Sequence, residues 1–79
     1  MLVRIDGYFH NEYTIKFVDC YDAMNYKSLY EAWTAPPPGG LLRIKRGLVG
    51  IVVEKFDEYS IIQVNAQLLY VPDSYIQEI

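Results

Sequence analysis

Short β-prone segments, each closed by turn residues, follow one another through the second half of this chain. Segments rich in Val, Ile, Leu and Tyr cover residues 41–45, 48–54, 59–64 and 68–71, and polar or glycine-containing turns separate them. Many short strands at such close spacing are typical of a small barrel or sandwich, and they argue against a layered α/β fold. The sequence therefore predicts a mainly β fold.

The size and composition of the chain fit one folded domain. It has 79 residues, of which 52% are hydrophobic and 22% are charged. This length allows one hydrophobic core and not two, since independent domains usually begin at roughly 50 residues. The hydrophobic content also lies well above that of disordered chains. We therefore expect a single domain over residues 1–79.

Before these strands, two more β-prone segments predict an N-terminal hairpin. Residues 2–9 and 13–18 mix β-branched and aromatic residues, and the polar residues 10–12 separate them as a turn would. We expect this hairpin, residues 1–17, to be an addition that pairs with or covers an edge of the barrel.

An arc over residues 24–40 has the hydrophobic period of a short helix. Its spacing places four residues on one helical face: Tyr26, Leu29, Tyr30 and Trp33. Asn25 or Asp22 is expected to cap the helix, and Pro36-Pro37-Pro38 must end it. This face packs on the barrel or forms a binding surface, and Trp33 is the residue expected to serve both.

The last segment carries a recognisable motif. The strand at 68–71 runs into Pro72-Asp73-Ser74-Tyr75 and then into a hydrophobic end at residues 76–79. This order resembles the end of a Src homology 3 domain, where a strand leads into Pro-x-x-Tyr and a final strand. Residues 73–75 are expected to form a single helical turn.

Earlier segments extend the resemblance over residues 18–79. Leu42-Arg43-Ile44-Lys45-Arg46-Gly47 looks like the family's apolar, any, apolar, basic, basic, Gly segment, and Val52-Val53-Glu54 fits the strand that follows it. Val18-Asp19-Cys20-Tyr21-Asp22-Ala23 is similar to the Ala-Leu-Tyr-Asp-Tyr signature. The resemblance implies a small Src homology 3-like β-barrel in which the arc is an enlarged RT-type loop.

The resemblance also implies a binding site. In this family, aromatic rings form a shallow groove for ligands in the polyproline II conformation. The resemblance implies that the groove residues here are Tyr21, Tyr59, Pro72 and Tyr75, unless Tyr21 and Tyr75 only pack in the barrel. Acidic neighbours that pair with Lys or Arg of such a ligand are Asp22, Glu31, Asp57 and Glu58, unless these are ordinary solubilising charges. We therefore expect a non-enzymatic module for a protein or proline-rich peptide, acting as an adaptor, complex subunit or inhibitor.

Two other functions stay open. A nucleic-acid or nucleoprotein accessory barrel would use Arg43, Lys45, Arg46 and Lys55, although the net charge of −3 does not favour a general nucleic-acid binder. A purely structural subunit would expose a broad apolar patch around Trp33. A homo-oligomer would form through Trp33 or the proline segment.

The remaining residues favour neither catalysis nor a cofactor. No nucleophile with a supporting base and no phosphate-binding glycine loop is found in the sequence, and one cysteine with one histidine is too few for a structural zinc site. We expect no enzymatic activity, cofactor or metal. The unpaired Cys20 suits the cytoplasm, and no apolar run approaches the roughly 20 residues that cross a bilayer.

Overall fold

The computed structural model describes residues 1–7 and 16–79. These residues form a mainly β fold. Its strands are β1 (Leu2–Ile5), β2 (Phe17–Asp22), β3 (Leu41–Lys45), β4 (Leu48–Lys55), β5 (Tyr59–Val64), β6 (Gln67–Pro72) and β7 (Ile76–Glu78). A helix, α1 (Leu29–Thr34), lies between β2 and β3, and a 3₁₀ turn, η1 (Asp73–Tyr75), lies between β6 and β7. The mainly β character predicted from the sequence is confirmed.

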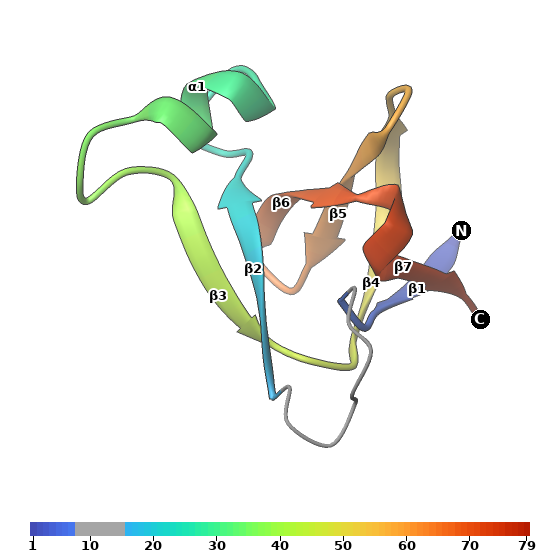
Figure 1. Ribbon diagram of the computed structural model, residues 1–79. Coiled ribbons are helices and arrows are strands. Elements are labelled where there is room, and N and C mark those ends of the chain that lie inside the picture. The colour runs from blue at the N-terminus through green and yellow to red at the C-terminus, as the bar shows by residue number, and fades with distance from the viewer. Residues whose placement is uncertain (8–15) are drawn as a thin grey trace.

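The strands form one antiparallel sheet in the order β3-β2-β6-β5-β4-β1-β7 (Figure 1). β4, β5 and β6 are consecutive neighbours, whereas β1 lies between β4 and β7. The hairpin of β2 and β3 extends away from the other strands, with α1 above its end (Figure 1). Only the end of β2 joins it to β6, through the pairs Tyr21 with Tyr70 and Asp22 with Leu69.

Side chains from non-neighbouring strands meet in one hydrophobic core. The cluster contains Val3, Ile5, Val18, Cys20, Ile44, Ile62, Val64, Leu69 and Val71. β1 and β2 both contribute to it although three strands separate them in the sheet order. The sheet must therefore curve around the core, and we call the side that lines the core its inner face and the other side its outer face.

A β-bulge in β4 changes which of its residues face inward. The register between β4 and β5 shifts between Val52 and Glu54, and Lys55 then pairs with Ser60. Because the extra residue, Val53, is inserted, Lys55 lies on the inner face beside Ser60 and Glu54 lies on the outer face. Without the bulge, strict alternation would give these two charged residues the opposite faces.

Several segments have the limits that the sequence predicts. The strands at 41–45 and 59–64, and the helical turn at 73–75, are confirmed residue by residue. The strand expected at 48–54 is one residue longer at its C-terminal end, and the strand expected at 68–71 is one residue longer at both ends.

The predicted pairing of the N-terminal hairpin, residues 1–17, is wrong for the described residues. β1 pairs with β4 on one side and with β7 on the other, while β2 pairs with β3 and β6. The predicted turn at 10–12 lies outside the described residues. β1 is thus an interior strand and not an addition at an edge, because its apolar residues Val3 and Ile5 are needed in the core.

The helix is shorter than the predicted stripe and begins later. Its N-cap is Ser28, whose hydroxyl accepts a hydrogen bond from the Glu31 backbone N–H at 3.1 Å, so the predicted caps Asn25 and Asp22 are wrong. The buried residue of α1 is Ala32, and the Gly40 N–H donates to its carbonyl at 3.3 Å. A side chain at Gly40 would come within 2.7 Å of the Ala32 Cβ. The small pair of Ala32 and Gly40 therefore lets the helix pack closely on the segment that leads into β3.

Candidate functional site

Four aromatic side chains form a row across the outer face of the sheet. Tyr21 of β2 lies opposite Tyr70 of β6. Tyr70 contacts Tyr59 edge-to-face, with 5.9 Å between the ring centroids, and Tyr59 stacks on Phe56 at 4.7 Å. Both arrangements are the favourable ones for aromatic pairs. We call Tyr21, Tyr70, Tyr59 and Phe56 the aromatic row.

The predicted groove residues lie around this row. Tyr59 pairs directly with Pro72 across β5 and β6. Burial, followed by the charge of Asp19 and then the nearby Tyr75 hydroxyl, raises the pKa of Tyr21. The structure thus brings Tyr59 to Pro72 and places Tyr75 near Tyr21, and all four side chains are half-buried. Tyr75 also packs against the hydrophobic core.

Tyr70 joins these two pairs, and the sequence did not single it out. Only 3% of its surface is exposed, and its hydroxyl donates to the Tyr26 carbonyl at 2.8 Å. The arc therefore covers this ring. Its outward direction follows from alternation in β6, where Leu69 and Val71 are fully buried in the core.

The surroundings of the Tyr70 hydroxyl are acidic. Burial raises the pKa of Tyr70 first, and Tyr59, Glu31, Glu54 and Asp22 then raise it further. These carboxylates come from the end of β2, from the arc and from the outward-facing part of β4. Of the acidic residues predicted for the site, the structure brings Asp22 and Glu31 close to the row and adds Glu54, which the sequence reasoning missed.

The predicted acidic residues differ in how their carboxylates are used. Glu31 accepts a hydrogen bond from the Lys27 N–H at 3.1 Å, which fixes the first turn of α1. Asp57 and Glu58 lie on the exposed turn between β4 and β5, and their carboxylates make no hydrogen bond or ion pair to the described chain. They remain available at the Phe56 end of the row.

Asp22 organises the start of the arc, and this role makes the arc sensitive to acid. Burial disfavours its charged form, but hydrogen bonds from the Asn25 side chain and from the Met24 and Asn25 N–H groups outweigh burial and lower its pKa. A carboxyl group with a lowered folded-state pKa stabilises the fold above the unfolded pKa of about 3.9. That stabilisation is lost as the pH falls through the folded-state pKa.

We therefore expect the wild type to be more stable than Asp22→Asn at neutral pH, and the difference to shrink as the pH falls below about 4. Urea unfolding of both proteins between pH 7 and pH 2 measures the difference directly, and comparing the two removes the effect of every other acid. A difference that stays constant across this range would contradict the assigned role of Asp22.

The expected helical face does not pack on the barrel as a unit. Tyr30 and Trp33 are 69% and 63% exposed, and their rings contact each other at 6.3 Å. Tyr26 precedes the helix, and Tyr26 and Leu29 are half-buried. The prediction that Trp33 packs in the core is thus wrong, because Ala32 is the residue of the helix that faces inward. We call Tyr30 and Trp33 the helix aromatic pair.

The basic residues of the rival hypothesis do not form one patch. Arg43 pairs with Asp19 at 3.1 Å, and Lys55 pairs with Asp73 at 3.0 Å on the inner face. Arg46 donates from Nε to the Asp6 carbonyl at 3.1 Å, while Lys45 is exposed on β3. Three of the four cationic side chains, Arg43, Lys55 and Arg46, thus already interact with a carboxylate or carbonyl oxygen of the domain. This arrangement does not favour nucleic-acid binding.

Cys20 is unsuited to nucleophilic chemistry. Its side chain is fully buried in the core, and burial, with a smaller effect of the Asp19 charge, raises its pKa to about 12. The thiol therefore stays protonated at neutral pH. In residues 1–7 and 16–79, no three His, Cys, Asp or Glu side chains gather as metal ligands would, and no helix is long and apolar enough to span a membrane.

Comparison with known proteins gave no relative: no protein-family model, curated protein or solved structure matches the chain. What the chain binds is therefore inferred from its own residues, above all from the aromatic row and the carboxylates around it.

Proposed function

We propose that this domain is a non-enzymatic protein-interaction module that binds a basic, proline-rich segment of a partner at the Phe56 and Tyr59 end of the aromatic row, beyond the Tyr70 ring that the arc covers. The observation that carries the proposal is the row itself, in which contacting rings cross the sheet beside Glu31, Glu54 and Asp22. Rings of this kind offer flat apolar surfaces to a ligand in the polyproline II conformation, which loses little entropy on binding. The carboxylates add selectivity for Lys or Arg in the ligand.

We also infer that the sheet is a Src homology 3-like barrel. The succession of β6, Pro72, η1 with Tyr75, and β7 supports this assignment, as does the single core inside the curved sheet. In such a barrel, Tyr59 and Pro72 lie where the resemblance puts the ligand groove. The unpaired, buried Cys20 is compatible with a reducing compartment such as the cytoplasm.

A second candidate, a structural subunit of a larger assembly, is favoured by the exposure of the helix aromatic pair. Trp33 and Tyr30 are both more than half exposed, and Trp and Tyr are enriched among the residues that dominate binding energy. The neighbouring prolines at 36–38 are exposed as well, so they do not fill the domain's own groove. An assembly made of copies of this chain alone would form through this region.

A peptide titration distinguishes the two candidates. The probe is a proline-rich peptide that carries one arginine, titrated into the ¹⁵N-labelled domain and followed by NMR. We expect chemical-shift changes at the aromatic row, and a loss of affinity of about tenfold or more for Tyr59→Ala, as for truncation of an interface hot spot. Replacing the peptide's arginine with glutamine is expected to weaken binding by a smaller factor.

Two control variants make the result specific. Val49→Ala removes an exposed apolar side chain from the outer face of β4, away from the row, and is expected to leave peptide affinity unchanged. Trp33→Ala is also expected to leave peptide affinity unchanged but to abolish any self-association seen by sedimentation. Equal losses for Tyr59→Ala and Val49→Ala, or shifts confined to α1, would show that the aromatic row is not the docking site.

A further inference from the structure

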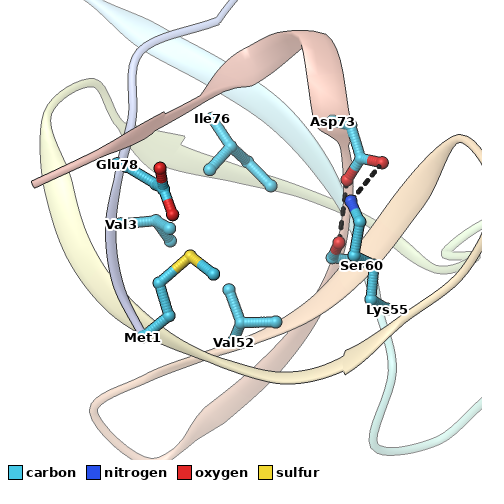
Figure 2. Close-up of a pocket in the computed structure, with 8 residues that line it drawn as sticks. All are labelled: Met1, Val3, Val52, Lys55, Ser60, Asp73, Ile76 and Glu78. Atoms are coloured by element: carbon cyan, nitrogen blue, oxygen red, sulfur yellow. Dashed lines mark hydrogen bonds and ion pairs between the residues drawn. The ribbon is translucent and has the colours of Figure 1, made fainter.

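A pocket of about 280 Å³ opens on the inner face of the sheet, at the end where β1, β4, β5, η1 and β7 meet (Figure 2). Its apolar wall consists of Met1, Val3, Val52 and Ile76, and its polar groups are Lys55, Ser60, Asp73 and Glu78. Pockets for drug-sized ligands usually measure about 300–1,000 Å³. This pocket therefore suits one side chain or a small molecule of similar size.

The polar groups on one side of the pocket satisfy one another. Lys55 Nζ lies 3.0 Å from Asp73 Oδ2, and the Ser60 hydroxyl donates to Asp73 Oδ1 at 2.8 Å. Ser60 is 2% exposed, so the hydroxyl holds this carboxylate from inside the fold. The charges of Lys55 and Asp73 compensate each other locally. This side therefore attracts neither a cation nor an anion strongly.

Glu78, on the other side, has no such compensation. Its carboxylate makes no hydrogen bond or ion pair within residues 1–7 and 16–79. Glu78 pairs with Val3, and alternation in β7 places it on the inner face together with Ile76. Figure 2 shows it across the opening from Lys55 and Asp73. An uncompensated carboxylate thus stands at the mouth of a mostly apolar pocket.

From this distribution of charge we propose that the pocket binds an aliphatic ammonium group on an unbranched chain, as a lysine side chain carries. The ammonium pairs with Glu78, and the methylene chain packs against Met1, Val52 and Ile76. The pocket lies on the opposite face of β5 from the aromatic row, so this site does not depend on the proposed function.

NMR titration of the labelled domain with n-butylammonium chloride tests the proposal, with n-butanol as the uncharged probe of the same length. We expect saturable shifts at Ser60, Ile76 and Glu78, and about fivefold tighter binding of the ammonium than of the alcohol, in the range of an exposed ion pair. Glu78→Gln should remove this preference. Glu58→Gln, which neutralises an exposed carboxylate outside the pocket, should keep it.

Further arms identify the source of the ligand and test the apolar wall. Nα-acetyl-lysine N-methylamide presents the same group as a partner protein would: saturable binding of this probe assigns the site to a lysine side chain, and binding of butylammonium alone assigns it to a small free amine. Val52→Leu, which fills part of the pocket, should weaken both charged and neutral probes. The proposal is overturned if the ammonium binds no tighter than butanol, if Glu78→Gln leaves the preference intact, or if no shift saturates.

Discussion

Replacing Gly50 with alanine is expected to destabilise the domain by about 3 kcal/mol, at the upper end of the usual cost of overpacking. Gly50 is buried in β4, and a Cβ built there would come within 2.6 Å of the Gln63 carbonyl oxygen and of Ile62 Cγ2. The carbonyl belongs to the neighbouring strand β5. It therefore moves only if the pairing of β4 with β5 is disturbed.

This loss is large relative to the expected total. A domain of 79 residues is stable by about 4–12 kcal/mol, at 0.05–0.15 kcal/mol per residue. Urea unfolding followed by tyrosine and tryptophan fluorescence measures the change.

Gly47→Ala is the matched control for Gly50→Ala. No atom lies within 4 Å of a Cβ at Gly47, but its φ of +91° is a conformation that L-residues rarely adopt. We expect it to cost only about 1 kcal/mol. If the two variants lost equal stability, Gly50 would not be packed as described.

Truncating Leu69 to alanine should cost about 2–5 kcal/mol, because it removes a fully buried side chain and leaves a cavity. Leu69 is 0% exposed and belongs to the core cluster with Ile62 and Val71. The curved sheet surrounds this cluster, so the strands cannot collapse into the space without losing their pairing. Thermal and urea unfolding both report the change, and the m-value should stay constant.

The neighbouring Leu68 provides the control for this variant. It is only half-buried, and alternation places it on the outer face. Leu68→Ala is therefore expected to cost clearly less than Leu69→Ala. A reversed order of the two would mean that β6 is shifted by one residue and that Tyr70 faces the core.

The local signals in the sequence predict the strands of the second half well. β3 and β5 have the predicted limits because glycine-containing or polar turn segments flank both ends of each strand. The partner of β1 could not be predicted in this way. Its neighbours β4 and β7 come from the middle and the end of the chain, and strand pairing over such distances depends on the core and not on adjacent residues.

The aromatic row was predictable only in part. Tyr59 and Pro72 follow from the Src homology 3 resemblance, and the structure pairs them. The outward direction of Tyr70 could not be predicted, because Tyr70 lies in an uninterrupted apolar run in which inward and outward positions look alike. The stacking of Phe56 on Tyr59 could not be predicted either, because Phe56 occupies a turn and the sequence does not show where its ring lies.

The exposure of Trp33 shows a different limit. Large residues at helical spacing usually face a core, and this rule predicts that Trp33 packs inward. In the structure Ala32 takes the inward position, because close approach to Gly40 requires a small residue there. A hydrophobic stripe identifies a helix more reliably than it identifies which side of the helix is buried.

The bulge at Val53 has a consequence for how the two proposed sites can change. Glu54 and Lys55 are adjacent in the chain, yet one borders the aromatic row and the other borders the pocket. If β4 paired with β5 without the bulge and Val53 were retained, the two side chains would exchange faces, bringing a cation to the rings and a carboxylate beside Asp73. Both sites would then fail together, so the register that the bulge sets is under tighter constraint than the identity of the exposed side chains in this hairpin.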